Sequence, residues 1–524
     1  MTRYKYLIII LILFTAYNSF FINKALHIDD SFTVSVAREV NTNFLKPSLV
    51  FFSNPPFLGY YYAPIIKIFG ENEIWLHIFY FIFSWSAIIS MFFLCKRFSR
   101  GSLIPLLFLI CTPAFIISSH GIMLDIPLLG FFLASIATFV YGVDRDNKIL
   151  LIISGLLTAA AILTKYSGLV LIPILFIYAL LNTSKKKASY LFIPIFMFLL
   201  WNLYCLLFYN YAIFFYALRS KLSHYFFDGI GIRMLASLSF LAGTSIVALF
   251  LTPLLLNKKK DMAYFSISLI AGALPFMIKG VFSEYSIFEK IVLSVLFISS
   301  TYIILLIVRG RGDKDSRFLS SWFVLMFIFV LFTNFIAARF LLLLMPPMFL
   351  LIYNHLPMAS KNKIRSAILI CFIFSTVLAI GDYQAADVYR DFIYSLGKGE
   401  GPYFLRGNSY DSWGYAYYSR KRHDLSEVDS DARKIPGDIF ITPTEPVLPI
   451  AIERKADFDK FLDARYKKTL IDRVFYRGHI FLHHRRLKAG FYSHDWGLLP
   501  FSFSVKKSSL EVFEIYRLGD KDES

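Results

Sequence analysis

Apolar runs long enough to cross a membrane recur along the first three quarters of the chain, from Tyr6 to Ile380. The hydrocarbon core of a bilayer takes about 20 residues of α-helix, so each run is a candidate span. The composition agrees, because 57% of the residues are hydrophobic and only 17% are charged. The pattern therefore predicts a multi-pass α-helical membrane protein, with a transmembrane domain over residues 1–381.

From Asp382 onward the sequence becomes polar and rich in turn residues. Residues 382–394 have a helical pattern, whereas residues 438–442 and 510–517 have the composition of strands. We therefore predict a small soluble α/β domain over residues 382–524.

The net charge of +18 does not indicate a nucleic-acid-binding protein. The 143-residue tail is nearly balanced, with 23 Lys and Arg against 22 Asp and Glu, so the excess belongs to the apolar part of the chain. It lies mostly in short loops between apolar runs, as cytoplasmic loops do. The four cysteines all fall inside apolar runs and have no metal-ligand spacing.

The basic loops also predict the topology. Successive basic loops must be separated by an even number of crossings if all of them are cytoplasmic. Residues 150–181 have basic residues at both ends, so parity divides this run into two short helices that turn near residues 164–168, with Lys165 on the outer side. The other predicted spans are residues 5–22, 74–94, 103–119, 124–142, 189–209, 234–256, 262–278, 288–308, 319–337, 340–356 and 364–381.

The total is about 13 transmembrane helices. An odd number places the N-terminus in the cytoplasm and the C-terminal domain outside it, across the cytoplasmic (inner) membrane.

The first outer loop, about residues 23–73, begins with two adjacent carboxylates, Asp29 and Asp30, directly after the first apolar run. A carboxylate at a membrane surface is costly to desolvate, which favours a functional role. The alternative is that Asp29 caps a following helix. We expect an amphipathic helix to start here and lie along the membrane surface. The loop continues into the aromatic-rich stretch 51–62.

Three further charged residues are predicted on the same face of the membrane. Asp125 stands at the outer start of the predicted span 124–142, Lys165 in the predicted turn, and Arg339 before the predicted span 340–356. Each has a structural alternative: Asp125 suits an ordinary helix N-terminus, and cations at membrane interfaces often snorkel. Their convergence on one face favours a site.

These motifs resemble the integral-membrane glycosyltransferases that take sugars from polyprenyl-phosphate carriers, the group with a GT-C fold that includes protein O-mannosyltransferases and lipid A aminoarabinose transferases. The matching stretches are His27–Val40, Ser53-Asn54-Pro55-Pro56, Leu124-Asp125-Ile126-Pro127, Leu163-Thr164-Lys165, and Ala338-Arg339-Phe340 through Pro346-Pro347. The sequence departs from the family pattern in having Asp30 instead of Glu, and Asn54 where relatives carry Lys or His.

The resemblance implies an inverting glycosyltransferase with Asp29 as the base. It also implies substrate-binding residues, which are Asp30, Arg38, Asn54, Tyr60, Tyr61, Asp125, Lys165 and Arg339. A carboxylate can take the proton of an acceptor hydroxyl, and a cation beside the phosphate can stabilise the leaving group. Aromatic faces would pack the sugar and the isoprenoid.

The expected partners are a polyprenyl-phosphate-linked sugar, a lipid, glycan or protein acceptor, and membrane lipid, without nucleic acid. Adjacent carboxylates facing a third also suit a divalent cation, although the sequence requires no metal. The alternative function is a transporter or flippase of lipid-linked sugars. A transporter should carry its ionisable groups at the bilayer midplane, often within inverted repeats.

Overall fold

The computed structural model describes most of the apolar part of the chain and several segments of the tail. The described residues are 2–47, 54–183, 185–221, 229–255, 259–309, 312–356, 361–397, 403–406, 413–422, 425–428, 439–444, 460, 462–464 and 466–520. The aromatic residues Phe51 and Phe52 of the first outer loop lie outside the described residues, as does the stretch 407–412.

The chain divides into two compact units. The first unit comprises Met1–Ile22 and Thr33–Thr376, and the second comprises Asn23–Phe32 and Val377–Ser524. The division at residue 376 lies five residues before the boundary expected from the sequence. The start of the first outer loop, with Asp29 and Asp30, belongs to the second unit together with the tail.

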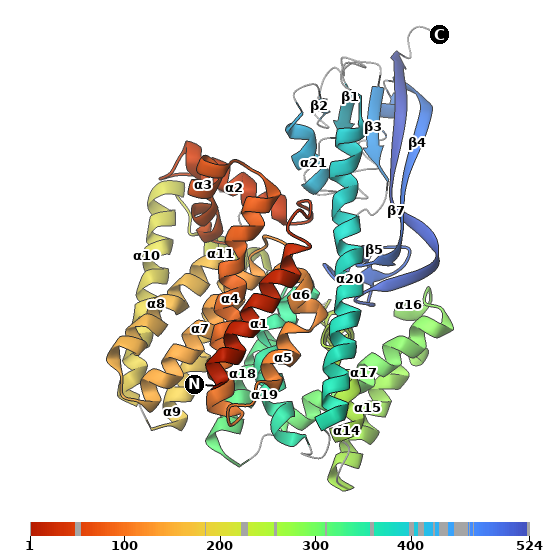
Figure 1. The fold of residues 1–524 in the computed structure, drawn as a ribbon. Coiled ribbons are helices and arrows are strands. Elements are labelled where there is room, and N and C mark those ends of the chain that lie inside the picture. The colour runs from red at the N-terminus through yellow and green to blue at the C-terminus, as the bar shows by residue number, and fades with distance from the viewer. Residues whose placement is uncertain are drawn as a thin grey trace. The chain divides into compact units, whose positions relative to one another are not determined.

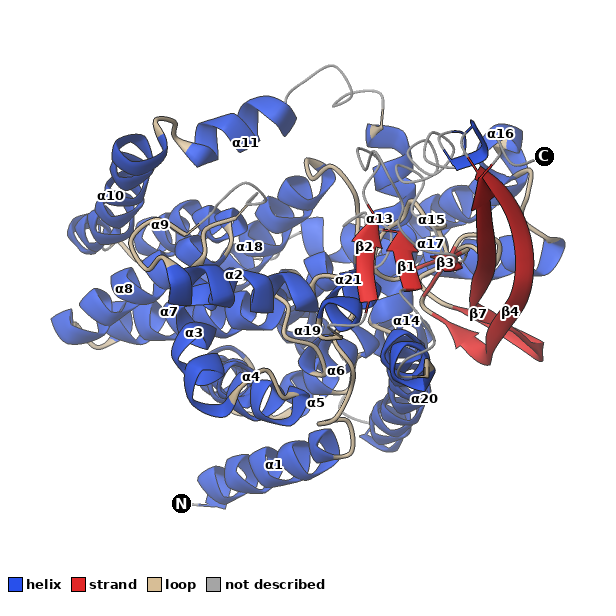
Figure 2. Ribbon diagram, turned by 90° about the horizontal axis from the view of Figure 1, so that it is seen from above, coloured by secondary structure: helices blue, strands red, loops and turns tan. Residues whose placement is uncertain are grey.

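The first unit is built of helices (Figures 1 and 2). In chain order they are α1 (Thr2–Ser19), α2 (Asp30–Thr42), α3 (Phe57–Phe69), α4 (Glu73–Phe98), α5 (Ile104–Ile110), α6 (Pro113–Ser119), α7 (Asp125–Asp144), α8 (Lys148–Thr164), η1 (Tyr166–Val170), α9 (Leu171–Leu181), η2 (Lys185–Leu191), α10 (Phe192–Tyr209), α11 (Ile213–Lys221), α13 (Ile230–Thr244), α14 (Val247–Leu255), α15 (Lys259–Met277), α16 (Lys279–Phe282), α17 (Ile287–Val308), α18 (Lys314–Leu331), η3 (Ala338–Leu343), α19 (Met345–His355) and α20 (Lys361–Ser395). The helix α2 begins at Asp30, close to the start predicted for the amphipathic helix. Its first three residues belong to the second unit, and α20 continues from the first unit into the second.

Helices α7 and α8 form a close pair that carries two of the predicted site residues at its ends. Small side chains let the backbones approach, since a Cβ added to Gly142 would lie 2.9 Å from Leu151. Hydroxyl groups then bond across the interface, with 2.7 Å between Ser135 Oγ and Thr158 Oγ1 and 2.9 Å from Ser154 Oγ to the carbonyl of Ser135. Small and hydroxylic residues are typical of helix pairs within membranes, where a polar group must find a partner inside the protein.

Five helices of the described residues are long and apolar enough to span a membrane, or six if one bent pair counts as a single span. The five are Glu73–Phe98, Asp125–Asp144, Lys185–Tyr209, Ile287–Val308 and Lys361–Ser395. The protein is therefore a helical, multi-pass membrane protein, but the predicted number of 13 spans is not confirmed. Several predicted spans are shorter or interrupted in the structure.

The interruptions have local causes. The predicted span 103–119 is two short helices, α5 and α6, because Pro113 starts a new helix and Thr112 Oγ1 accepts a hydrogen bond from the amide of Phe115 at 3.2 Å. The predicted span 234–256 bends by 90° between α13 and α14. The predicted span 340–356 is the 3₁₀ helix η3 followed by α19, whose first turn holds prolines. By contrast, the run 150–181 does break at Lys165, between α8 and η1, as parity predicts.

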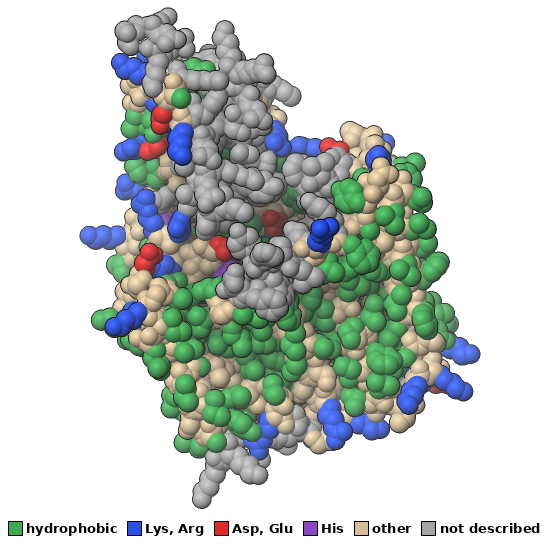
Figure 3. Space-filling model, turned by 180° about the vertical axis from the view of Figure 1, so that it is seen from behind, with side chains coloured by type: hydrophobic (Ala, Val, Ile, Leu, Met, Phe, Trp, Pro, Cys, Tyr) green, Lys and Arg blue, Asp and Glu red, His purple; other side chains and the backbone are tan. Residues whose placement is uncertain are grey.

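The surface of the first unit is largely apolar. On the face shown in Figure 3, hydrophobic side chains cover most of the helices, and Lys and Arg side chains gather along one edge. Large exposed hydrophobic residues are spread over many helices, for example Ile12 on α1, Leu207 on α10 and Phe288 on α17. Such a surface is suited to contact with lipid rather than water.

The second unit is a mixed sheet with helices. The sheet has the order β2-β1-β3-β7-β4, in which β1 is parallel to β2 and β3, and β7 is antiparallel to β3 and β4. The strands are β1 (Tyr403–Arg406), β2 (Leu425–Val428), β3 (Ile439–Pro443), β4 (Tyr466–Phe481) and β7 (Ser502–Asp520), with β5 (His483–His484) paired to β6 (Ala489–Gly490) and the helix α21 (Trp413–Arg420). The strands predicted at 438–442 and 510–517 are present as β3 and part of β7.

The C-terminal half of α20 packs against this sheet. The ring of Phe392 stacks on Phe513 of β7 at 3.7 Å, and the Tyr389 hydroxyl donates to Glu511 at 3.0 Å. A Cβ added to Gly381 would lie 2.5 Å from Ile480 of β4, so this glycine permits close packing. The helix predicted for residues 382–394 is therefore the end of the long helix α20 rather than a separate element.

Candidate functional site

The first unit brings three of the predicted site residues into direct contact. Lys165 Nζ lies 2.8 Å from Asp125 Oδ1, and Arg339 Nε lies 3.1 Å from Asp125 Oδ2. Both cations also approach the ring of Phe340, with Lys165 Nζ 4.3 Å from its centre and the Arg339 guanidinium carbon 5.5 Å from it. We call Asp125, Lys165 and Arg339 the cation site, after its two positively charged side chains. It holds two positive charges and one negative charge, so it is suited to a further anion.

Each residue of the cation site stands where a helix breaks. Asp125 is the first residue of α7, Lys165 is extended between α8 and η1, and Arg339 is the second residue of η3. The turn at Lys165 is fixed by Gly168, where an added Cβ would lie 2.6 Å from the backbone of Ala161. The cations are little exposed, with 18% of the Lys165 side chain and 5% of Arg339 accessible to solvent. Burial strengthens their interaction with any bound anion.

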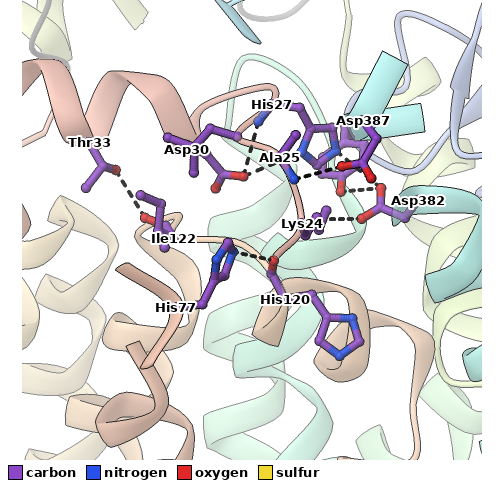
Figure 4. A network of polar contacts seen from close by, with 12 residues as sticks. Lys24, Ala25, His27, Asp30, Thr33, His77, His120, Ile122, Asp382 and Asp387 are labelled. Carbon is purple, nitrogen blue, oxygen red and sulfur yellow. Dashed lines mark hydrogen bonds and ion pairs between the residues drawn. The ribbon is translucent and has the colours of Figure 1, made fainter. Parts of the chain in front are cut away.

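The segment that precedes Asp125 is held by side chains from two other helices. His77 Nε2 lies 3.0 Å from the carbonyl of His120, and the Tyr80 hydroxyl donates to the carbonyl of Met123 at 2.6 Å, both from α4. Thr33 of α2 donates to the carbonyl of Ile122 at 3.1 Å. Figure 4 shows the His77 and Thr33 contacts. These bonds satisfy backbone carbonyls of a loop and so fix the start of α7.

The other predicted residues of the first unit have defined positions. Arg38 forms a bidentate ion pair with Glu71, which ties α2 to the end of the first outer loop. The Tyr60 and Tyr61 hydroxyls each donate at 2.8 Å, to the carbonyls of Phe44 and Phe79 respectively. Asn54 is half-buried, three residues before α3. Their predicted contacts with substrate stay predictions.

In the second unit, the start of the first outer loop contains a buried charged cluster. It consists of Lys24, His27, Asp30, Asp382 and Tyr492, each of which is at most 4% exposed. Lys24 Nζ lies 2.5 Å from Asp382 Oδ2, and the Tyr492 hydroxyl donates to Asp382 Oδ1 at 2.7 Å. We call these five residues the first-loop cluster, and Figure 4 labels Lys24, His27, Asp30 and Asp382.

His27 connects the two carboxylates of the first-loop cluster. Its Nε2 lies 3.3 Å from Asp382 Oδ1, and its Nδ1 lies 3.4 Å from Asp30 Oδ2. Asp29 follows Ile28 and is half-buried, whereas Asp30 is fully buried. Of the two adjacent carboxylates, Asp29 is therefore the more accessible.

The pKa values of two histidines of the second unit, His27 and His483, shift in opposite directions. Burial and Lys24 act to lower the pKa of His27, but the carboxylates of Asp382 and Asp30 raise it, and the net shift is upward from 6.5. Burial, together with the neighbouring His27, lowers the pKa of His483 from 6.5 to about 3. His483 is thus held neutral near pH 7, and His27 favours its charged form.

Lys24, Asp382 and Tyr492 were not recognised from the sequence. Lys24 is a lone cation directly after an apolar run, and Asp382 is the first carboxylate after the last apolar run. These positions at the ends of apolar runs are the feature of the sequence that could have identified the two residues. Lys24 and Asp382 are 358 positions apart, so only the folded chain reveals that they pair.

Metal binding receives no support from the described side chains. Among them, no three His, Cys, Asp or Glu residues lie close enough together to hold a metal ion. The divalent cation considered from the adjacent carboxylates therefore has no described ligand set.

Comparison with known proteins supports the resemblance drawn from the motifs. The family model described as dolichyl-phosphate-mannose-protein mannosyltransferase matches residues 53–204. This segment contains Asn54, Asp125 and Lys165. The match confirms the resemblance to membrane glycosyltransferases that use lipid-phosphate sugars.

Two solved structures are also similar to the chain. They are crystal structures of ArnT from Cupriavidus metallidurans, one in the apo state, with 15% identity and a TM-score of 0.40, and one bound to undecaprenyl phosphate, with 14% identity and a TM-score of 0.41. Each likeness covers 85% of this chain and 94% of the other. TM-scores of this size carry no information about the site. No curated protein matches the chain by sequence.

Proposed function

We propose that the protein transfers a sugar from a polyprenyl-phosphate carrier to an acceptor hydroxyl, on the outer face of the cytoplasmic membrane. The observation that carries the proposal is the cation site, in which Lys165 and Arg339 share Asp125. The match of residues 53–204 to a family whose described donor is a dolichyl-phosphate sugar supports the donor class. The same match does not favour the alternative, a transporter or flippase.

The charge of the cation site suits the donor. A sugar phosphodiester carries one negative charge, and the polyprenyl phosphate that leaves carries more. The three residues together carry a net charge of +1, so they attract the donor and attract the leaving phosphate more strongly. Stabilisation that grows along the reaction lowers the barrier rather than only tightening binding.

Asp29 supplies the base in this proposal. Its carboxylate takes the proton of the acceptor hydroxyl while the acceptor oxygen bonds to the anomeric carbon of the sugar. The bond between that carbon and the phosphate oxygen breaks at the same time, and polyprenyl phosphate departs with the electron pair. Attack from the side opposite the phosphate inverts the anomeric configuration.

Asp125 holds the two cations in this account, and the predicted aromatic contacts pack the sugar and the isoprenoid chain. Half-burial of Asp29 and full burial of Asp30 support the choice of Asp29 as the residue that meets the acceptor. Asp30 then supports Asp29 through the turn that both residues share.

The experiment that tests the donor class measures binding without requiring an acceptor. Purified protein in detergent is titrated with undecaprenyl phosphate, and binding is followed by native mass spectrometry. The wild type should bind, and Lys165→Met should bind at least about ten-fold more weakly because a charge-assisted pair with phosphate is lost. Equal binding by both proteins contradicts the assignment of the cation site to phosphate.

A further inference from the structure

The start of the first outer loop is folded together with the tail, not with the helices that follow it. Residues Asn23–Phe32 belong to the second unit, along with Val377–Ser524. The loop that presents Asp29 therefore takes its shape from the second unit.

The backbone of this loop is held at three of its four residues 23–26 by side chains of the second unit. The guanidinium of Arg390 donates to the carbonyl of Asn23 at 2.7 Å, the amide of Ala25 donates to Asp387 at 3.0 Å, and the amide of Leu26 donates to the Tyr418 hydroxyl at 2.8 Å. The loop also runs close to α21, because a Cβ on Gly414 would lie 2.7 Å from the carbonyl oxygen of Leu26. Loop backbone with this many partners is fixed in one conformation.

The first-loop cluster adds a charged anchor to these bonds. Asp382 contacts Lys24 through Oδ2, and His27 and the Tyr492 hydroxyl through Oδ1, so both of its carboxylate oxygens have polar partners. Burying two cations and two carboxylates is a poor way to gain stability, since well-packed apolar residues often do as well or better. A charged group fixes position more strictly than an apolar one, because its partners must be met at defined atoms.

The anchor extends from Asp382 through His27 to the turn that contains Asp29. The amide of His27 donates to Asp30 Oδ2 at 3.4 Å, and the amide of Asp30 donates to the carbonyl of His27 at 3.0 Å. Between them, Ile28 has a φ of +49°, a conformation that is costly for a β-branched residue. Such strain persists only where surrounding contacts hold the backbone in that conformation, and it is often found at functional sites.

We propose that the C-terminal unit is a positioning element of the active site: Lys24, His27, Asp382 and Tyr492 hold the turn 27–30 so that Asp29 meets the acceptor. The proposal rests on the function proposed above and gives the tail a role within it. Lys24, His27, Asp382 and Tyr492 act through Asp29 and are positioning residues.

The most direct test is Tyr492→Phe, which removes the hydroxyl bond to Asp382 but keeps a ring against His27, 5.3 Å away. The matched control is Tyr516→Phe, which removes a hydroxyl bond to Glu514 of 2.6 Å on the sheet of the same unit. Both variants retain the packing of the aromatic ring, so both should fold.

Steady-state kinetics separate positioning from donor binding. We expect Tyr492→Phe to lower kcat by about ten-fold and Lys24→Met by up to about 10²-fold, because small displacements of a reacting group have effects of this size. The KM for the lipid-linked donor should stay within about two-fold of the wild type, since the donor phosphate is bound elsewhere. Lys24→Arg should restore part of kcat, because the charge remains. A wild-type kcat in both Tyr492→Phe and Lys24→Met, or a raised donor KM with unchanged kcat, overturns the proposal.

Hydrogen exchange tests the same proposal without turnover. In full-length purified protein, the peptide covering residues 23–32 should exchange faster in Tyr492→Phe than in the wild type, and at the wild-type rate in Tyr516→Phe. Equal exchange in the three proteins overturns the anchoring role whatever the enzyme does. Faster exchange in a protein that transfers no sugar in its wild-type form would instead refute the proposed function and leave the anchoring intact, so the two failures are distinguishable.

Discussion

Loss of the ammonium group of Lys165 should slow sugar transfer by about 10²- to 10³-fold. The substitution is Lys165→Met, which keeps most of the length of the side chain. In the folded protein it changes the net charge of the cation site from +1 to zero, because Arg339 and Asp125 then balance. The remaining site attracts the leaving phosphate far less.

The magnitude follows from the charge that develops during the reaction. One unit of charge about 4 Å from an ammonium gains about 4 kcal/mol at an effective dielectric constant of about 20. That corresponds to a factor of about 10³ in rate. The Lys165 side chain retains 18% of its exposure, so water screens part of this interaction and the lower end of the range is the better expectation.

A matched control lies just past the other end of α7. Lys187 pairs with Asp146 at 3.0 Å, and its side chain is 21% exposed, close to the 18% of Lys165, although Asp146 is 87% exposed. Lys187→Met therefore removes an ion-paired lysine of similar exposure outside the cation site. The assay is the initial rate of transfer against the concentration of the lipid-linked donor, with both variants purified and checked for folding. The reasoning is refuted if Lys165→Met keeps the wild-type kcat/KM, or if Lys187→Met loses as much.

The remaining predictions concern the base, the titration of the cluster and the topology. Asp29→Asn should lower kcat by about 10² or more with the fold retained, measured by initial rates and circular dichroism, and a near-normal rate would make Asp29 a capping residue. The raised pKa of His27 means that its charged form stabilises the fold below pH 6.5 and that this contribution is lost as pH rises through the folded-state pKa. His483, whose pKa falls to about 3 on folding, is neutral in both the folded and the unfolded protein only well above pH 6.5, and there it adds no slope. The gap in melting temperature between wild type and His27→Gln should therefore shrink from pH 6.5 to 9, and a constant gap would contradict this. A periplasm-active reporter fused after Ile380 should give signal and one fused within 257–261 should not, whereas the opposite pattern would reverse the assignment of the outer face.

The sequence was sufficient for the features that repeat along the chain or depend on near neighbours. Apolar runs predicted a helical membrane protein, and the basic residues at both ends of 150–181 predicted the break at Lys165, where a fixed turn now stands. The composition of residues 438–442 and 510–517 predicted strands, and both are present. The start of α2 at Asp30 was also local, because the amphipathic pattern begins there.

Two kinds of feature were not predicted: breaks inside an apolar run, and contacts between residues far apart in the sequence. The span expected at 103–119 is interrupted because Thr112 caps a new helix ahead of Pro113, and hydropathy averages over such a break. The long helix α20 continues past the last apolar residues because its polar end packs on the sheet, for example through Phe392 and Phe513. The pair of Lys24 and Asp382 could not be foreseen, since each residue alone is an ordinary flank of an apolar run.

The cation site was likewise predicted only in part from the sequence. Three charged residues from separate motifs, Asp125, Lys165 and Arg339, were expected on one face, and the structure brings them into contact. The spacing of the motifs could not predict that two cations share one carboxylate, because this contact depends on where α7, η1 and η3 begin. The sharing sets the charge of the site and hence its preference for an anion.

The central claim is that the protein breaks the bond between sugar and polyprenyl phosphate. The most direct measurement reconstitutes the purified protein in liposomes with a polyprenyl-phosphate-linked sugar and an acceptor-containing membrane extract, and quantifies free polyprenyl phosphate by mass spectrometry. The account predicts that free polyprenyl phosphate appears in step with sugar on the acceptor, and that both depend on Asp29 and Lys165. Movement of the intact lipid-linked sugar across the bilayer, with no polyprenyl phosphate released, would contradict it.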